Sequence, residues 1–220
     1  MKLVLASGSQ RRRELLTMCG YDYEIIVSNA DETIDENDPE SFVRALSFRK
    51  AKDVFDRLFA AGRRDFAVIG SDTVVALQKE GETKPVIIGK PKDAEDAVRI
   101  LSMLSGKTHR VFTGVSVIAD IPDENAAAQC SIREKAEIQT ECSITEVTFE
   151  TLSPDEITDY VNSGDPLDKA GSYGIQGPFG MFVREIRGNY FTVIGMPIPV
   201  LYKMLKKIGI LPHGFYERIE

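Results

Sequence analysis

Residues 7–13 (SGSQRRR) combine small side chains with three consecutive arginines, directly after a short apolar run. The apolar run predicts a buried strand, and residues 10–18 predict a helix with Ser9 as its N-cap. A helix N-terminus offers free N–H groups and partial positive charge, so it binds anions readily. Three arginines there oppose the helix dipole, whereas a bound phosphate would accept their hydrogen bonds. From this segment alone, a phosphate site and a solvated basic helix start are equally good interpretations.

A carboxylate lies inside the apolar segment 66–77, where Gly70, Ser71 and Asp72 interrupt a run rich in β-branched residues. Burying an unpaired carboxylate costs free energy, so Asp72 is either a paired structural acid or a metal ligand or base. Gly70 would permit close approach of the backbone to a ligand. Together these features favour a functional role for Asp72.

Residues 168–177 (DKAGSYGIQG) contain three glycines and a lysine, a composition that suits a backbone shaped around a ligand. The run has neither Walker A nor GxGxxG spacing, and taken alone it is more typical of an ordinary turn. Glu32, Lys52 and Lys90, considered one by one, are more typical of surface charges. His109, just before a predicted strand, is better interpreted as a structural hydrogen-bonding residue than as a catalyst.

The elements that must position these residues alternate between strand and helix patterns, without an internal repeat or linker. Strands are predicted at residues 2–6, 23–27, 66–77, 86–88, 110–119, 136–150, 181–186 and 190–194. Helices are predicted at residues 10–18, 39–61, 93–104, 153–164 and 199–208. The last two strands read as a hairpin, and residues 120–134 read as a loose hairpin tip or an insertion. Intermixed strands and helices predict an α/β fold with a mixed sheet, in a single domain spanning residues 1–220.

Composition narrows the function classes. The 220 residues are 43% hydrophobic and 28% charged, as in an ordinary soluble globular protein. A net charge of −7 argues against a nucleic-acid partner, since that function needs a basic face. Three cysteines without paired spacing argue against a disulfide framework or a zinc site. No apolar run is long enough for a signal peptide or a membrane span, so we expect a cytoplasmic protein without a membrane partner.

Several of these segments occur in the order and with the content of one known family. The motifs are LASxSxRRxELL from residue 5, GxDT from residue 70, GKP from residue 89, LSGxxHxVxT from residue 104, DKAGxYxIQG from residue 168 and GMP from residue 195. Together they resemble the Maf family over residues 3–208. Gln10 departs from the proline that the family commonly has, which should weaken the helix start but leave an anion site intact.

The resemblance implies a metal-dependent nucleoside triphosphate pyrophosphatase with a house-cleaning role. It implies an elongated mixed β-sheet flanked by helices, in two lobes around a central cleft, as in the related inosine-triphosphate pyrophosphatases. Asp72 would be the general base, and Glu32 with Asp72 would hold a divalent cation, Mg²⁺ or Mn²⁺. The triphosphate would be held by Ser9, Arg12, Arg13, Lys52 and Lys90, with Lys169 near the same cleft.

Three further positions resemble the branch that acts on dTTP and UTP, namely Arg11, Thr73 and Gln176. The side chain of Gln176 offers both donors and acceptors, which suits the imide edge of uracil or thymine. We therefore expect dTTP, UTP and, by extension, modified uridine triphosphates as substrates. The alternatives are a 7-methyl-GTP pyrophosphatase of the same family and a non-catalytic regulator of cell division or septum formation. The resemblance also implies a homodimer.

Overall fold

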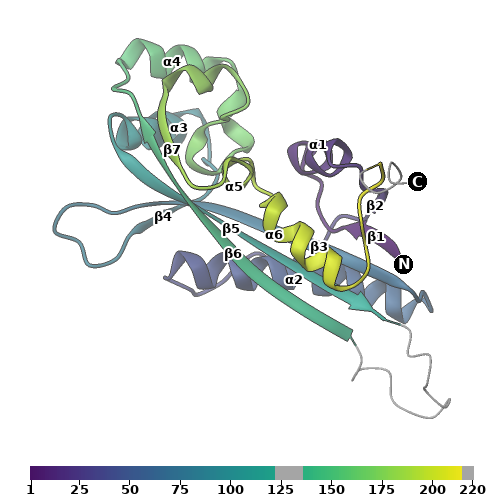
Figure 1. Cartoon of the computed structure of the whole chain (residues 1–220). Coiled ribbons are helices and arrows are strands. Elements are labelled where there is room, and N and C mark those ends of the chain that lie inside the picture. Colours follow the sequence, from purple (N-terminus) through teal and green to yellow (C-terminus); the bar gives the residue numbers. More distant parts are fainter. Residues whose placement is uncertain (122–135, 215–220) are drawn as a thin grey trace.

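The computed structural model describes residues 1–121 and 136–214, and its strands form one sheet in the order β2-β1-β3-β5-β6-β7, with β4 paired to β3 (Figure 1). The described strands are β1 (Lys2–Leu5), β2 (Tyr23–Ile25), β3 (Phe66–Leu77), β4 (Val86–Ile88), β5 (Thr108–Asp120), β6 (Ala136–Phe149) and β7 (Val183–Arg187). The described helices are α1 (Gln10–Met18), α2 (Pro39–Ala60), α3 (Ala94–Leu104), α4 (Pro154–Asn162), α5 (Tyr190–Ile194) and α6 (Ile198–Lys207), with short 3₁₀ turns η2 (Asp165–Asp168), η3 (Ala170–Ser172) and η4 (Pro178–Phe182).

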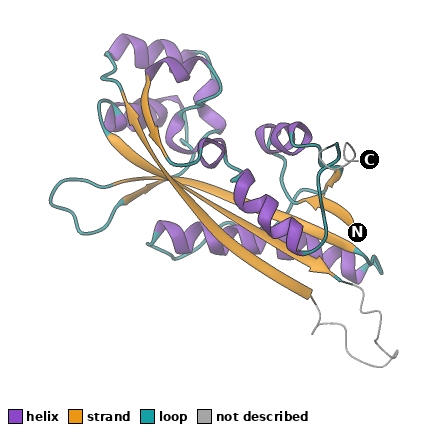
Figure 2. Ribbon diagram, in the orientation of Figure 1, coloured by secondary structure: helices purple, strands orange, loops and turns teal. Residues whose placement is uncertain are grey.

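The sheet is mixed, which confirms the predicted α/β class. β1 is parallel to both β2 and β3, whereas β3, β4, β5, β6 and β7 pair in antiparallel fashion. The long strands β3, β5 and β6 form the centre of the molecule (Figure 2). Helices α3 and α4 gather at one end of these strands, and α1 lies with β1 and β2 toward the other (Figure 1). No helix within the described ranges is both long and apolar enough to cross a membrane.

Helix α2 packs with its backbone directly on the sheet, because two glycines make room for it. Gly70 on β3 and Gly114 on β5 lie on the same face of the sheet. A Cβ atom at Gly70 would collide with the carbonyl oxygen of Ser47, and one at Gly114 with that of Val43. Since both carbonyls belong to α2, the helix lies as close to the strands as backbone contact allows. The turn of α2 that follows is therefore held over the middle of β3.

Part of one edge of β3 is open. β1 pairs with β3 only as far as Ile69, and β4 begins to pair at Val75. Within the described part of the chain, no strand pairs with this edge of β3 between those two residues. Asp72 lies in the middle of the gap, and strand alternation places its side chain on the α2 face and that of Thr73 on the opposite face. A ligand at this edge can therefore reach side chains of both faces.

The structure corrects the predicted hairpin near the C-terminus. The first half is strand β7, which pairs with β6, but residues 190–194 form helix α5. Five residues are too few to distinguish the pattern of a helix from that of a strand. The capping residue favours the helix, because the Asn189 side chain accepts a hydrogen bond from the backbone N–H of Thr192. Gly195 then ends the helix in the left-handed conformation, with φ of 110°. Most of the predicted insertion, residues 122–134, lies outside the described residues.

Strand β3 runs without a break through residues 70–72, which interrupt its apolar sequence. The polar side chains within it have partners. The Ser71 hydroxyl donates to the carbonyl oxygens of Gly114 and Gly195, at 2.9 and 3.0 Å. The hydroxyls of Thr73 and Thr113 lie 3.0 Å apart. Because these groups are satisfied, the strand crosses the core without an unpaired hydroxyl at these positions.

His109 lies in an aromatic cluster, where its Nε2 atom is 3.0 Å from the Tyr173 hydroxyl and its ring packs edge-on against Phe149. Burial lowers the pKa of His109 to about 3, so the imidazole is neutral at physiological pH. This environment supports the structural interpretation of His109.

The buried imidazole predicts a loss of stability in acid. The unfolded chain binds a proton near pH 6.5, whereas the folded chain does so only near pH 3, so stability falls as the pH drops through this window. Between pH 7 and pH 5 the contribution of His109 is about 2 kcal/mol. We therefore expect the unfolding free energies at these two pH values to differ less in His109→Gln, by that amount, as measured by urea titration. An equal difference in both proteins would show that the histidine is not buried in its neutral form.

Candidate active site

A cavity of about 470 Å³ opens at the uncovered edge of β3. Its walls come from the β1–α1 loop, helix α2, strand β3, and the loop after η2, so segments from both ends of the chain meet there. The sequence-predicted residues that line it are Ser9, Arg11, Arg12, Glu32, Asp72, Thr73, Lys90, Lys169 and Gln176. Arg13 and Lys52 are predicted site residues that the structure does not bring to this cavity.

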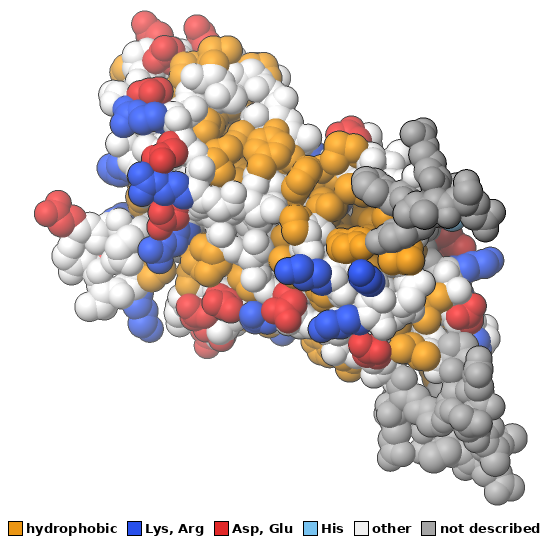
Figure 3. Space-filling view, viewed as in Figure 1, with side chains coloured by type: hydrophobic (Ala, Val, Ile, Leu, Met, Phe, Trp, Pro, Cys, Tyr) orange, Lys and Arg blue, Asp and Glu red, His pale blue; other side chains and the backbone are white. Residues whose placement is uncertain are grey.

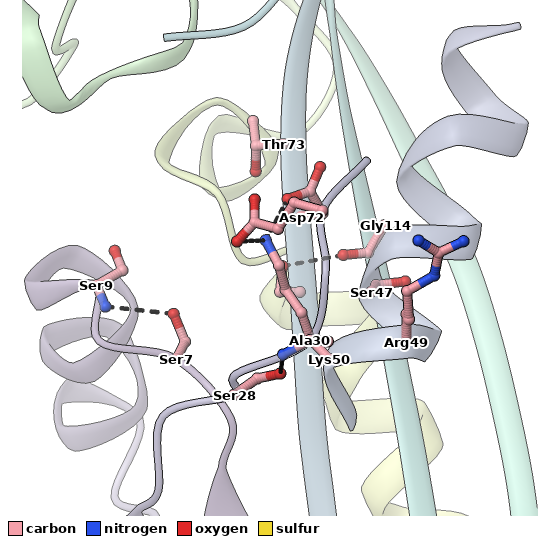
Figure 4. Close-up of polar contacts among 12 residues, drawn as sticks. Ser7, Ser9, Ser28, Ala30, Ser47, Arg49, Lys50, Asp72, Thr73 and Gly114 are labelled. Carbon is pink, nitrogen blue, oxygen red and sulfur yellow. Dashed lines mark hydrogen bonds and ion pairs between the residues drawn. The ribbon is translucent and has the colours of Figure 1, made fainter. Parts of the chain in front are cut away.

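An ammonium group joins two acidic residues of the cavity, Asp72 and Glu32. The Lys50 Nζ atom lies 2.7 Å from Asp72 Oδ1, as Figure 4 shows, and 3.1 Å from Glu32 Oε1. The side chains of Lys50 and Asp72 are only 12% and 11% exposed, whereas that of Glu32 is 65% exposed. The site therefore consists of a buried ion pair with a second carboxylate at its open side.

Lys50 replaces Lys52 as the α2 cation of the site. The Lys52 side chain is 51% exposed and forms an ion pair with Asp56 one turn further along α2. Two residues on a helix differ by about 200° in direction, so both lysines cannot face the sheet. The signal that could have distinguished them is spacing: Lys50 lies seven residues after Val43 and four before Val54, both of which are buried against the sheet.

Arg13 lies one position beyond the residues of α1 that face the cavity. Its backbone carbonyl accepts a hydrogen bond from the Tyr23 hydroxyl, at 2.8 Å. A step of one residue turns a helical side chain by about 100°, so the third arginine of the run leaves the face shared by the cavity. Ser9 occupies the N-cap position of α1, as predicted.

Arg12 holds three segments together at the cavity wall. Its guanidinium donates from Nε to the Gly195 carbonyl at 2.9 Å, from Nη1 to the Ser7 hydroxyl at 3.1 Å, and from Nη2 to the Thr73 hydroxyl at 3.4 Å. Burial lowers the pKa of Arg12, but an arginine stays charged inside proteins. Arg12 therefore places a fixed positive charge beside Asp72.

Burial raises the pKa of Asp72 above its ordinary value, and the positive charges of Lys50 and Arg12 offset this only in part. A carboxylate whose pKa moves toward neutrality is a stronger base when ionised. Lys50 and Arg12 also favour the ionised form that can accept a proton. Asp72 thus has the properties of a general base.

A second group of charges spans the cavity. Arg11 Nη1 lies 3.2 Å from Asp168 Oδ2, and Lys169 Nζ lies 2.7 Å from the other oxygen of the same carboxylate. Asp165 also accepts from Lys169, at 3.0 Å. Arg11 and Lys169, which lie 158 residues apart in the sequence, therefore meet at the Asp168 carboxylate. A phosphate group in the cavity would compete with this carboxylate for both cations.

The carboxylates of Glu32 and Asp72 are the candidate metal ligands of the cavity. No group of three or more His, Cys, Asp or Glu side chains gathers as a metal site among residues 1–121 and 136–214. Mg²⁺ is often held by only one or two carboxylates, with phosphate oxygens of the substrate and water completing its shell. Glu32 and Asp72, whose oxygens meet at one ammonium, fit that kind of site.

A family profile described as "Maf-like protein" matches residues 2–208 of the chain. The chain belongs to the Maf family. Among its Maf relatives, proteins named dTTP/UTP pyrophosphatase are 40% identical over 217 residues in Agathobacter rectalis (95% of this chain, 98% of that protein) and 42% identical over 210 residues in Clostridium beijerinckii (94% and 100%). A third, from Bacillus thuringiensis subsp. konkukian, is 42% identical over 210 residues (95% and 96%) and has the same name.

Among solved structures, this Maf protein is similar to the Ham1 protein of Staphylococcus aureus, with 16% identity and a TM-score of 0.47 over 94% of this chain and 99% of that one. Family membership rests on the profile and on the sequence relatives, which agree with the resemblance seen in the motifs.

The Maf motifs divide between the cavity and its support. Residues of the first motif, of GxDT, of GKP and of DKAGxYxIQG line the cavity, as does Val111 of LSGxxHxVxT. The GMP motif supports the cavity wall, since the Gly195 carbonyl accepts hydrogen bonds from both Arg12 and Ser71. In the LSGxxHxVxT motif, the Thr113 hydroxyl donates to the Thr192 carbonyl at 2.7 Å and so fixes α5 against β5.

Proposed function

We propose that this Maf protein hydrolyses dTTP and UTP to the nucleoside monophosphate and pyrophosphate. The observation that carries the proposal is the Lys50–Asp72–Glu32 arrangement, set in a cavity that also presents Arg11, Arg12 and other cations. On the face shown in Figure 3, Lys and Arg side chains are interspersed with Asp and Glu. Cations gathered locally in a cavity suit a small anion such as a nucleotide.

In the proposed reaction, Asp72 accepts a proton from the water molecule that attacks the α-phosphorus. A bond forms between the water oxygen and that phosphorus, and the bond from the α-phosphorus to the bridging oxygen of the β-phosphate breaks. Pyrophosphate leaves with the electron pair of that bond. Lys50 keeps Asp72 ionised before the attack, and the cavity cations stabilise negative charge on the phosphates.

Glu32 and Asp72 are the residues that would hold Mg²⁺ or Mn²⁺ in this proposal. The cation would neutralise charge on the triphosphate and lower the pKa of water bound to it. The Glu32 side chain is 65% exposed at the open side of the cavity, where a cation would arrive with the substrate.

The base preference is inferred from three cavity residues. Arg11, Thr73 and Gln176 all line the cavity, and the relatives named above carry the dTTP/UTP name. Gln176 can pair with the imide edge of uracil or thymine through one donor and one acceptor. Uridine triphosphates modified elsewhere on the base retain this edge and belong to the same proposal.

Pyrophosphate release from dTTP, UTP, CTP, GTP, 7-methyl-GTP and ITP, with Mg²⁺ or Mn²⁺, tests the function. We expect release mainly from dTTP and UTP. A preference for 7-methyl-GTP would assign the chain to the other branch, and no release from any nucleotide would favour a non-catalytic regulator of division.

Gln176→Ala should change base preference more than it changes handling of the triphosphate. We expect kcat/KM for dTTP and UTP to fall by about ten- to a hundredfold, since one or two hydrogen bonds to the base are lost. Values for the poorer nucleotides on the same panel should change by less than threefold. An equal loss for every nucleotide would instead make Gln176 a general structural residue.

The cellular setting follows the same family inference. We propose that the protein acts in the cytoplasm as a homodimer. Light scattering of the purified protein at micromolar concentration tests the second part, and a mass of one chain would contradict it.

A further inference from the structure

The loop that carries Glu32 is tied to helix α2 by a residue that is not part of the cavity lining. Arg49 Nη1 donates to the backbone carbonyl of Asp31 at 3.0 Å and to that of Thr33 at 2.8 Å. These two carbonyls belong to the residues on either side of Glu32. Lys50, the next residue on α2, contacts the Glu32 carboxylate itself. Adjacent residues of one helix therefore hold the backbone and the side chain of the same segment.

A second tie lies one turn further along α2. Asp53 Oδ2 accepts hydrogen bonds from the Ser28 hydroxyl at 3.0 Å and from the Asn29 N–H at 2.9 Å. Ser28 in turn accepts from the Ala30 N–H at 3.1 Å, as Figure 4 shows. Burial raises the pKa of Asp53, but the hydrogen bonds from Asn29 and Ser28 outweigh this effect, so its pKa lies below the ordinary value. Asp53 is therefore ionised and a strong acceptor at neutral pH.

Arg57 makes the third contact between α2 and the loop that carries Glu32. Arg57 Nη2 donates to the Val27 carbonyl at 2.8 Å and contacts Asp53 Oδ2 at 3.1 Å. Arg49, Asp53 and Arg57 recur every fourth residue, so they occupy one face of α2. Between them they bind backbone groups of residues 27, 29, 31 and 33. Exposed ion pairs contribute little to stability on average, but contacts of this kind fix where a loop lies.

We propose that Arg49, Asp53 and Arg57 are positioning residues that hold residues 27–33 so that the Glu32 carboxylate reaches Lys50. The proposal rests on the function proposed above for Glu32, and it assigns these residues no contact with substrate. Helix α2 would then have two roles. Lys50 contributes charge to the site, and Arg49, Asp53 and Arg57, on the neighbouring face of the helix, position the Glu32 carboxylate.

The test compares Arg49→Ala with Arg99→Ala, which removes an exposed arginine from helix α3, where it pairs with Asp96. The first measurement is amide hydrogen exchange of peptides covering residues 27–33, which needs no activity. We expect faster exchange there in Arg49→Ala and no change in Arg99→Ala. Arg49→Lys should recover part of the protection, because a single nitrogen makes both contacts in the native protein.

The second measurement is kcat/KM for dTTP in the native and Glu32→Gln backgrounds. We expect Arg49→Ala to lower it about tenfold in the native background and to add nothing in Glu32→Gln, since Arg49 acts only through Glu32. Unchanged exchange, or an equal loss in both backgrounds, would overturn the proposal. If exchange rises while Glu32→Gln itself turns over normally, the tether stands as a structural fact, and the role proposed for Glu32, and with it the positioning role, is wrong.

Discussion

We expect Lys50→Met to lower kcat/KM for dTTP by about a thousandfold and Lys52→Met to change it by less than about twofold. The difference follows from where α2 points the two side chains: Lys50 lies 2.7 Å from Asp72, and Lys52 faces solvent beside Asp56. Removing one partner of a buried ion pair leaves the other charge uncompensated, and removing a single charged donor from an active site commonly costs two to three orders of magnitude.

The same substitution should change the pH dependence. Lys50 lowers the pKa of Asp72, so its loss raises that pKa further above the ordinary value. The acid limb of the kcat/KM profile, which reports the protonation of the free enzyme's base, should therefore move to higher pH in Lys50→Met. Both variants are compared on one buffer series. If Lys52→Met were the impaired variant, the assignment of the α2 cation would be wrong.

We expect Asp72→Asn to reduce turnover of dTTP by about a thousandfold or more and to leave the protein folded. Loss of a general base typically removes a factor of 10² to 10⁴, and asparagine cannot accept the proton from water. Burial raises the pKa of Asp72, so its ionised form costs stability at pH 7. The neutral amide removes that cost, and the buried Lys50 ammonium keeps the Glu32 carboxylate as its ion-pair partner. We therefore expect only a small change in the free energy of unfolding at pH 7.

Single-turnover pyrophosphate release and urea unfolding measure the two effects separately. Nucleotide binding, followed by calorimetry under conditions without turnover, should persist in Asp72→Asn because the cavity arginines are unchanged. Retained turnover would remove Asp72 as the base. A large loss of stability would instead make it a structural acid paired with Lys50.

The elements that the sequence placed well have long, regular patterns. Helix α1 begins and ends as predicted, after its N-cap residue Ser9, and the bounds of β3 agree because its apolar run extends over 12 residues. The short segment at residues 190–194 was misread, since its outcome depended on a single side chain, that of Asn189. Local sequence pattern therefore predicts long elements well, but it does not predict a short element whose conformation depends on one capping residue.

The site could be predicted in part for a similar reason. Asp72 and Thr73 stand out because polar residues in an apolar strand are unusual, and motif order adds the arginines. Lys52 was predicted instead of Lys50, two positions away on the same helix, although the spacing of Lys50 from Val43 and Val54 favours Lys50. The ties from Arg49 to the Glu32 loop involve backbone carbonyls, which carry no mark in the sequence.

Asp72 lies in the middle of a strand rather than on a loop, and this has a consequence for how the protein can change. β5 pairs with β3 on both sides of Asp72, from Ala67 to Ala76, so the carboxylate cannot travel toward a ligand. Any closing motion must be made by segments around it, such as the run from Asp168 to Gln176, since contacts from α2 hold the loop with Glu32. Base preference could therefore change through residues around the cavity, such as Gln176, while the position of the Asp72 carboxylate stays fixed.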